Sequence, residues 1–188
     1  RIRNTAKFLL GNLAGFDPKQ HLLEPEKCLL LDQWAMAKTR QLHERITDAY
    51  NQYDFARVVS SLQNFCTQEM GSLYLDVTKD RLYTMQVDSH GRRSAQSAMY
   101  AIVQVLVRAL APITSFTAEE IWQLIPGEKT QSVFFANNAE LDKLLPINGQ
   151  YMQSDNAMMQ QLLAMREAVS KVLEPMRSNG EIGAALQA

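Results

Sequence analysis

The sequence has few of the residues that build covalent or phosphate-binding sites. Its 188 residues include only two cysteines and eight glycines. Cys28 and Cys66 lie far apart, each within an apolar helical pattern, so neither a disulfide framework nor a C-x-x-C motif is expected. Burial of both thiols in a reducing compartment is the simpler interpretation. The glycines are scattered at helix ends and turns, and they form no glycine-rich phosphate loop.

The chain also has almost no net charge and no long apolar run. Nineteen basic residues face twenty acidic ones, for a formal net charge of −1, so neither DNA nor a membrane is expected as a partner. Any site for a polyanion must therefore be local. No apolar stretch approaches the roughly eighteen residues of a membrane span, and no signal peptide is visible. These absences favour a cytoplasmic protein.

Candidate catalytic residues are equally scarce. The three histidines, His21, His43 and His90, have no spacing that suits a metal ion. The pair Glu119 and Glu120 stands in the first turn of an expected helix, where negative charge favours the helix dipole without any catalytic role. We therefore expect no catalytic residue, no metal ligand and no cofactor site in this chain.

What the sequence does contain is helical periodicity, with apolar residues recurring at spacings of three and four. The expected helices are residues 1–13, about 30–52, 55–77 after a cap at Asp54, about 92–110, 117–125 and 155–177. Long helices joined by short loops, with no convincing strand, predict an all-α fold, an antiparallel helix bundle. The nearly continuous apolar pattern before Leu110 places that helix at the centre.

The expected domain organisation follows from where this periodicity weakens. Residues 1–127 form the bundle core, 128–154 an irregular connection that admits a short extended segment at 132–135, and 155–188 a last helix and the start of a junction. The first residues are already in helical phase, and the last eight begin an apolar pattern that stops early. We therefore expect a piece of a larger protein.

The stretch LAPITSFTAEEIW, Leu110–Trp122, predicts a fixed corner between two helices. Pro112 cannot sit in a helix interior and biases Ala111 away from helical angles, so the preceding helix must end there. Thr117 and Glu120 have the spacing of a capping box, and Phe116 and Ile121 occupy the positions of a hydrophobic staple. Trp122 is expected in the core.

The remaining candidates are basic residues at the ends of expected helices. They are Arg1, Arg3 and Lys7 on the first helix, Lys79 and Arg81 beside Tyr83, and Arg92 and Arg93 across a polar loop. If the 55–77 and 92–110 helices are antiparallel neighbours, the last two groups share one end of the bundle. The cations could then hold phosphates while the tyrosine stacks on an unpaired base. The simpler alternative is that they complement helix dipoles or are merely solvated.

Three motifs carry a resemblance to a known family. LAPITSFTAEEIW resembles a segment of the anticodon-binding helical domain shared by isoleucyl-, valyl-, leucyl- and methionyl-tRNA synthetases, and RIRNTAKFLLGNL is similar to that domain's entry helix. The third motif, YDFARVVSSLQNFCTQEMGSLYLDVTKDRLY, matches the family at Tyr53, Phe55, Tyr74, Asp76, Lys79, Asp80, Arg81 and Tyr83. RRSAQSAMY and the final RSNGEIGAALQA look more like isoleucyl than valyl enzymes, which stay as the weaker alternative.

The resemblance implies a module that docks the anticodon stem and loop of isoleucine tRNA. The parent enzyme, implied to be a monomeric class I aminoacyl-tRNA synthetase, would join isoleucine to its tRNA using ATP and magnesium, with zinc bound elsewhere. The nucleotide-binding signatures of such enzymes are absent here, so catalysis is expected outside this chain. The anticodon loop would then meet Lys79, Arg81, Tyr83, Arg92 and Arg93, and the stem backbone would meet Arg1, Arg3 and Lys7.

A hypothesis from a different class is a helical protein-interaction module. It would bind a partner helix through Met-containing faces, for instance at Met152, Met158 and Met159. Such binding should be insensitive to salt, whereas tRNA binding should weaken steeply as salt rises.

Overall fold

The computed structural model describes residues 1–145 and 150–183, which divide into two compact units, Arg1–Ile147 and Asn148–Ala188. The first unit contains α1 (Ile2–Asn12), α2 (Pro18–His21), η1 (Pro25–Lys27), α3 (Leu30–Asn51), α4 (Phe55–Asn64), η2 (Phe65–Tyr74), α5 (Leu75–Val77), α6 (Lys79–Thr84), α7 (His90–Leu110), α8 (Ser115–Leu124), η3 (Val133–Phe135), η4 (Asn138–Glu140) and α9 (Leu141–Leu144). The second contains α10 (Gln150–Ser178). These described ranges hold no strand, so the all-α prediction is confirmed.

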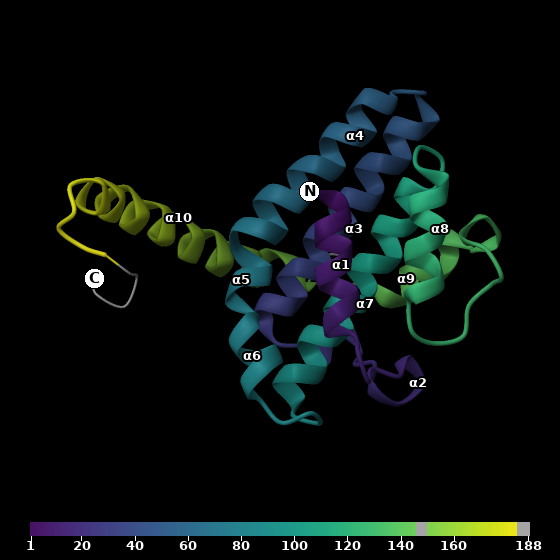
Figure 1. The fold of residues 1–188 in the computed structure, drawn as a ribbon, viewed down its shortest axis with the longest axis horizontal. Coiled ribbons are helices and arrows are strands. Elements are labelled where there is room, and N and C mark those ends of the chain that lie inside the picture. Colours follow the sequence, from purple (N-terminus) through teal and green to yellow (C-terminus); the bar gives the residue numbers. More distant parts are fainter. Residues whose placement is uncertain (146–149, 184–188) are drawn as a thin grey trace. The chain divides into compact units, whose positions relative to one another are not determined.

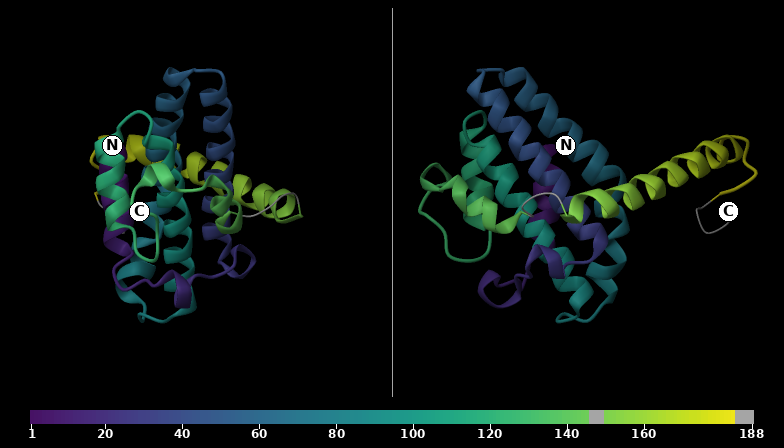
Figure 2. Two further views of the ribbon diagram at one scale, coloured as in Figure 1. Left: turned by 90° about the vertical axis from the view of Figure 1, so that its right-hand side faces the viewer. Right: turned by 180° about the vertical axis from the view of Figure 1, so that it is seen from behind.

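Helix α7 is the central element of the first unit, as predicted. It contacts α1, α3, α6 and α8, which surround it in the views of Figures 1 and 2. Nearly all of its residues after Arg92 are buried, with Arg108 only partly so. Ala98 and Ala101 are fully buried and small, which allows the neighbouring helices to approach closely. The bundle is therefore organised around one apolar helix. Its N-terminal end follows the connection between Thr84 and His90, which we call the α6–α7 turn.

The expected single helix over 55–77 is instead interrupted by a π-helical stretch. Asp54 caps α4 as predicted, since its Oδ1 accepts from the amide of Arg57 at 3.0 Å. The chain then winds more widely through η2, where the Thr67 hydroxyl donates to the carbonyl of Gln63, four residues earlier. Such back-bonding competes with the regular ladder and loosens a helix. The wider winding was not predictable from the apolar spacing alone.

The corner after α7 differs from its predicted form. Helix α7 ends at Leu110, but Ala111 keeps helical angles, with φ −52° and ψ −44°. The amides of Ile113 and Thr114 both donate to the carbonyl of Leu110, which turns the chain sharply. Helix α8 therefore begins at Ser115, two residues before the expected cap.

The earlier start removes the expected capping box and staple. Thr114, the residue before α8, makes no side-chain cap hydrogen bond, and Thr117 already lies inside the helix. Glu120 bonds to Arg3 at 3.2 Å instead of reaching back. Phe116 is 94% exposed and cannot act as a staple. Trp122 is buried as expected, and its Nε1 donates to the carbonyl of Thr130 at 3.0 Å.

The segment from 128 to 145 has no extended piece at 132–135, where the structure has the short helix η3. Glu119 accepts from both the Ser132 hydroxyl and the Val133 amide, which coils the chain tightly there. The later part of this segment is held to the bundle by two ion pairs. Arg108 bonds to Glu140 at 2.9 Å and Arg40 to Asp142 at 3.2 Å.

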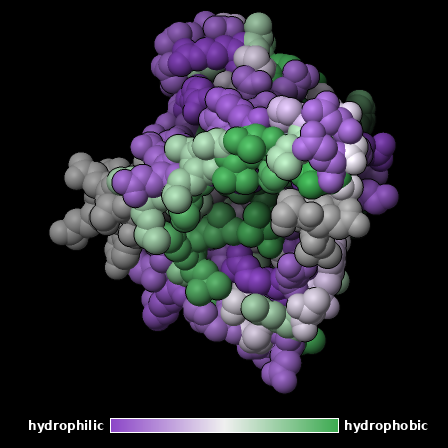
Figure 3. Space-filling model, turned by 90° about the vertical axis from the view of Figure 1, so that its left-hand side faces the viewer, coloured by the Kyte–Doolittle hydropathy of each residue, from purple (hydrophilic) through white to green (hydrophobic). Residues whose placement is uncertain are grey.

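The second unit consists mainly of α10, which begins at Gln150 rather than at 155 and stops before Gly180, as predicted from Asn179-Gly180. A row of its apolar side chains is exposed, namely Met158, Leu162, Met165, Val169 and Val172. Figure 3 shows that hydrophobic side chains, in green, reach the molecular surface on one face. Of the methionines proposed for partner binding, Met158 is exposed, Met159 is buried and the side chain of Met152 lies outside the described part. Residues 184–188 of the last motif also lie outside it. None of the described helices is both long and apolar enough to cross a membrane.

Candidate nucleic-acid interface

The α6–α7 turn brings the two expected groups of cations together. The guanidinium of Arg81 lies 3.4 Å from the carbonyl oxygen of Gly91, and that of Arg92 lies 3.4 Å from the carbonyl oxygen of Met85. Both contacts cross the turn. Ser89 caps α7 by accepting from the Arg92 amide at 3.4 Å. The prediction that Lys79, Arg81, Arg92 and Arg93 lie at one end of the bundle is therefore confirmed, although their side chains have different surroundings.

Arg81 forms a bidentate ion pair with a buried carboxylate, that of Asp32. Its Nη1 and Nη2 donate to Oδ2 and Oδ1 of Asp32 at 2.7 and 3.0 Å. The Asp32 side chain is fully buried and that of Arg81 is 14% exposed. Asp32 also accepts from the Tyr74 hydroxyl at 2.8 Å and from the Ser94 hydroxyl at 2.5 Å. We call these four residues, Asp32, Tyr74, Arg81 and Ser94, the Asp32 network.

Inside the Asp32 network, the surroundings of Arg81 and Tyr74 keep both side chains protonated. Burial opposes the charge of Arg81, but the hydrogen bonds to Asp32 and its negative charge raise the pKa of the guanidinium above its ordinary value. Burial, together with the adjacent Asp32, raises the pKa of the Tyr74 hydroxyl well above its usual range. The tyrosine therefore stays a neutral donor and the arginine a cation, which leaves the carboxylate fully compensated.

Arg93 is also enclosed, in a second set of contacts. Its side chain is 8% exposed, Nη1 donates to Oε1 of Gln96 at 2.8 Å, and Nη2 donates to Oδ1 of Asp88 at 2.7 Å. Nη1 also lies 3.4 Å from the carbonyl oxygen of Gly15. The hydrogen bond from Arg93 lowers the pKa of Asp88. The simpler alternative of a merely solvated Arg93 is thus wrong, because the side chain points into the fold and links the α1–α2 connection to α7.

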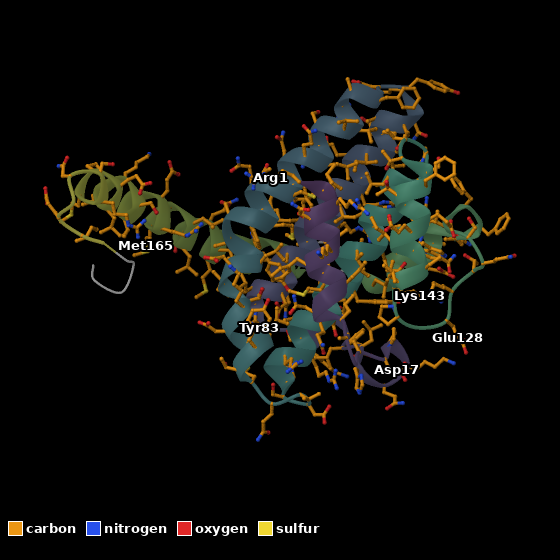
Figure 4. The ribbon with its side chains drawn as sticks, in the orientation of Figure 1. Arg1, Asp17, Tyr83, Glu128, Lys143 and Met165 are labelled. Atoms are coloured by element: carbon orange, nitrogen blue, oxygen red, sulfur yellow. The ribbon has the colours of Figure 1, made fainter. Side chains whose placement is uncertain are left out.

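Of the predicted groups at this turn, Lys79 and Tyr83 are exposed and Arg92 is partly exposed. Tyr83 is 64% exposed on α6, near the lower end of the bundle in Figure 4. Lys79 bonds to Asp76 at 2.9 Å, a pair whose side chains are 48% and 65% exposed. Solvent screening makes such a pair weak, so Lys79 can exchange its carboxylate for a phosphate. Arg92 is partly exposed and bonds only to a carbonyl among the contacts given above.

The cations at the start of the chain and on α1 belong to the same unit but lie away from the α6–α7 turn. In Figure 4, Arg1 is labelled well above Tyr83. Arg3 forms an exposed pair with Glu120 at 3.2 Å, its side chain being 74% accessible. Lys7 is exposed and has no ion-pair partner among the described residues. Arg1 and Arg3 border an open groove of about 480 Å³, which is lined by the apolar residues Ile2, Leu110 and Ile121 as well as by Gln63, Thr67, Thr114 and Thr117. The two arginines at its edge offer positive charge to a polyanion.

Comparison with known proteins places this arrangement in a family. The sequence profile described as the anticodon-binding domain of tRNA ligase matches residues 32–188. This chain belongs to that family. The motif-based resemblance is confirmed. Lys79, Tyr83 and Arg92 at the α6–α7 turn lie within the matched range.

Individual relatives of this anticodon-binding domain carry a more specific name. The isoleucine–tRNA ligase of Xanthomonas campestris pv. campestris strain 8004 is 55% identical over all 188 residues, which cover 20% of that protein. The isoleucine–tRNA ligases of Xanthomonas oryzae pv. oryzae strain MAFF 311018 and Stenotrophomonas maltophilia strain K279a are 55% and 54% identical over the same span. The chain thus spans about a fifth of the length of the curated relatives it matches.

Sequence reasoning missed the residues that build this anticodon-binding domain from within. Asp32, Ser94 and Gln96 were given no role, yet they receive the two arginines. One signal was available for Asp32: it is a lone carboxylate in the apolar run LLLDQWAMA, and a charge in a buried helix face needs a partner. The same argument identifies Arg108, which lies 4.9 Å from the Trp122 ring centroid and pairs with Glu140.

Metal and thiol chemistry find no support in the described side chains. Within 1–145 and 150–183, no group of three His, Cys, Asp or Glu residues could hold a metal ion. The zinc and magnesium implied for the parent enzyme have no donor set there, and we derive no step through them. Cys28 and Cys66 are buried free thiols, as expected, and burial raises the pKa of each to about 11.

Proposed function

We propose that this anticodon-binding domain holds the anticodon stem and loop of isoleucine tRNA for a larger isoleucine–tRNA ligase. The observation that carries the proposal is the 55% identity to isoleucine–tRNA ligases along the whole chain. The named ligases do not favour the valyl alternative, and the family match does not favour a protein-interaction module. Cytoplasmic location, a monomeric parent, use of ATP with magnesium, and a zinc site elsewhere in the parent belong to the same proposal.

The proposed contacts to the anticodon loop are Lys79, Tyr83 and Arg92. Bases of an anticodon loop are unpaired and can stack on an exposed aromatic ring, while cations on rigid helix ends hold the phosphates. Tyr83 supplies the ring, and Lys79 and Arg92 stand at the same turn. Burial removes Arg81 and Arg93 from direct phosphate contact in this proposal.

The proposed contact to the stem backbone is the α1 region, defined by Arg1, Arg3 and Lys7. Its support is the position of Arg1 and Arg3 at the edge of the groove and the exposure of Lys7. A double-stranded stem is recognised mainly through its phosphates and 2′-hydroxyls, which suits arginine, glutamine and threonine side chains.

The test is steady-state kinetics of the full-length ligase with Lys79→Glu. Charge reversal places a carboxylate against phosphate, so the KM for isoleucine tRNA should rise while isoleucine-dependent ATP–pyrophosphate exchange stays at the wild-type rate. The matched control is Lys171→Glu, an exposed lysine of α10 that also pairs with a carboxylate on its own helix. An unchanged KM for tRNA in Lys79→Glu would remove this lysine from the site.

A further inference from the structure

The buried end of Arg81 suggests a role for it other than phosphate binding. The Asp32 network joins Asp32 of α3 and Ser94 of α7 to Tyr74 of η2 and Arg81 of α6, two elements of one helical run. Three side chains converge on one carboxylate, and Ser94 additionally accepts from the amide of Leu29 at 2.8 Å. Its polar groups are therefore paired with one another inside the fold.

The Asp32 network links the helical run η2–α5–α6 to α3 and α7. Helix α6 is the last part of this run, which continues through Thr78 with helical backbone angles. Two of its side chains face inward, the buried Leu82 and the largely buried Arg81. Lys79 and Tyr83, on the same helix, face solvent. The two parallel bonds of a guanidinium on a carboxylate fix orientation as well as distance.

We infer that Asp32 and Arg81 are positioning residues for tRNA binding: their bidentate pair fixes α6 so that Lys79 and Tyr83 meet the anticodon loop together. This inference rests on the proposed function. Arg81 then makes no contact with phosphate itself. The opposite assignment would have Arg81 leave Asp32 for a phosphate, stranding a fully buried carboxylate without its counter-charge, which is strongly unfavourable.

The experiment is a double-mutant cycle on isoleucine tRNA binding to the full-length ligase, measured at several salt concentrations. The variants are Asp32→Asn, Arg81→Gln, their combination and, as a direct-contact reference, Lys79→Gln. Asp32→Asn and Arg81→Gln should each weaken tRNA binding by roughly three- to a hundredfold. The double variant should bind no more weakly than the single variant with the lower affinity, because each single change already removes the same ion pair. The slope of log affinity against log salt should stay at the wild-type value in all three, because these variants lower the fraction of free protein with α6 in its binding position but leave the Lys79–phosphate contact of the bound state in place.

The reference variant separates positioning from phosphate contact. Lys79→Gln removes one phosphate contact and should lower that slope by about 0.7–0.9. If Arg81→Gln lowers the slope as Lys79→Gln does, or if Asp32→Asn leaves affinity unchanged or increases it, the inference is overturned. Arg57→Gln, which removes an exposed cation near the start of α4, is the control expected to bind like wild type.

A milder variant covers the case in which Asp32→Asn does not fold. Tyr74→Phe removes one hydrogen bond to Asp32 without changing any charge, and thermal melting checks that the variant is folded. It should weaken tRNA binding with an unchanged salt slope, and unaltered affinity would contradict the inference. A wild-type ligase that fails to bind isoleucine tRNA even at low salt would instead overturn the proposed function itself.

Discussion

The α6–α7 turn and the α1 region were both predicted as tRNA contacts from clusters of cations, yet the structure treats their cations differently. At the turn, Arg81 is largely buried against Asp32, and Arg93 is buried although its partner Asp88 is exposed. In the α1 region, Arg3 forms only an exposed pair with Glu120. Counting basic residues therefore overstates the positive charge available to a polyanion. What matters is whether the cation itself is buried in the fold, as Arg81 and Arg93 are.

The largest expected effect is on the buried side of this comparison. Asp32→Ala leaves Arg81 buried without its partner and should lower the free energy of unfolding by about 3–5 kcal/mol. Urea denaturation followed by circular dichroism measures the change. Asp48→Ala, which breaks the exposed pair with Arg57, is the matched control and should cost at most about 1 kcal/mol. Equal losses in the two variants would show that burial does not distinguish the pairs.

A buried thiol that reports on local opening lies beside each of the two regions. Cys28 is close to Ser94 of the Asp32 network and Cys66 is close to Thr5 of α1, but burial dominates and raises both pKa values to about 11. At pH 8 the reactive thiolate should therefore be scarcer by roughly a hundredfold than for an exposed cysteine, and iodoacetamide should react slowly with both.

The pH dependence of these thiols has a definite sign. The unfolded chain releases the two protons near pH 9, while the folded chain keeps them until about pH 11. Burial of the thiols therefore contributes stability that is present below about pH 9 and is lost as the pH rises toward 11. Ser94→Ala removes bonds to Asp32 and to the amide of Leu29, so it should let the fold open more often near Cys28 and speed alkylation of that thiol alone, as read by mass spectrometry. Faster labelling of Cys66 as well would mean that the two regions do not open independently.

A smaller effect is expected on the exposed side of the turn. Tyr83→Ala removes a ring that is 64% exposed and should leave stability nearly unchanged. Loss of one base-stacking partner should weaken tRNA binding by about 1–3 kcal/mol, as measured by fluorescence titration. Tyr53→Ala, which removes a more exposed ring at the α3–α4 connection, should not affect binding. Similar losses for both rings would contradict a specific role of the turn.

The smallest effect is expected in the α1 region. Arg3→Ala breaks a solvated pair with Glu120 and should change the free energy of unfolding by at most about 1 kcal/mol. Thermal denaturation at low and high salt is the measurement. A large, salt-independent loss would show that Arg3 is structural, as Arg81 is, and would remove the contrast between the two regions.

The sequence predicted the helices and the common end of the cations, because apolar spacing and cap residues are local signals. Asp54 as a cap and α7 as the central helix are examples. Local patterns failed where a distant partner decides the outcome. Lys79 and Arg81 stand two residues apart with the same charge, and only the fold places Asp32 against the second.

The helix starts and windings that were wrongly predicted have similar causes. Thr117 and Glu120 have the spacing of a capping box, but the backbone hydrogen bonds to the carbonyl of Leu110 turn the chain so that α8 begins earlier. Glu120 pairs with Arg3 instead. The π-helical stretch η2 keeps the apolar face that a regular helix would show, so periodicity could not reveal it. The contact roles of Lys79, Tyr83 and Arg92 stay predictions.

The central claim is that this domain binds a polyanion through a few exposed cations, and the salt dependence of wild-type binding tests it most directly. Fluorescence titration of the full-length ligase with isoleucine tRNA, at 50 mM and 200 mM salt beside a non-cognate tRNA, gives the slope. We predict tighter binding of the cognate tRNA and a steep loss of affinity at the higher salt, from the release of several counterions. An affinity for isoleucine tRNA that does not change with salt would contradict the account.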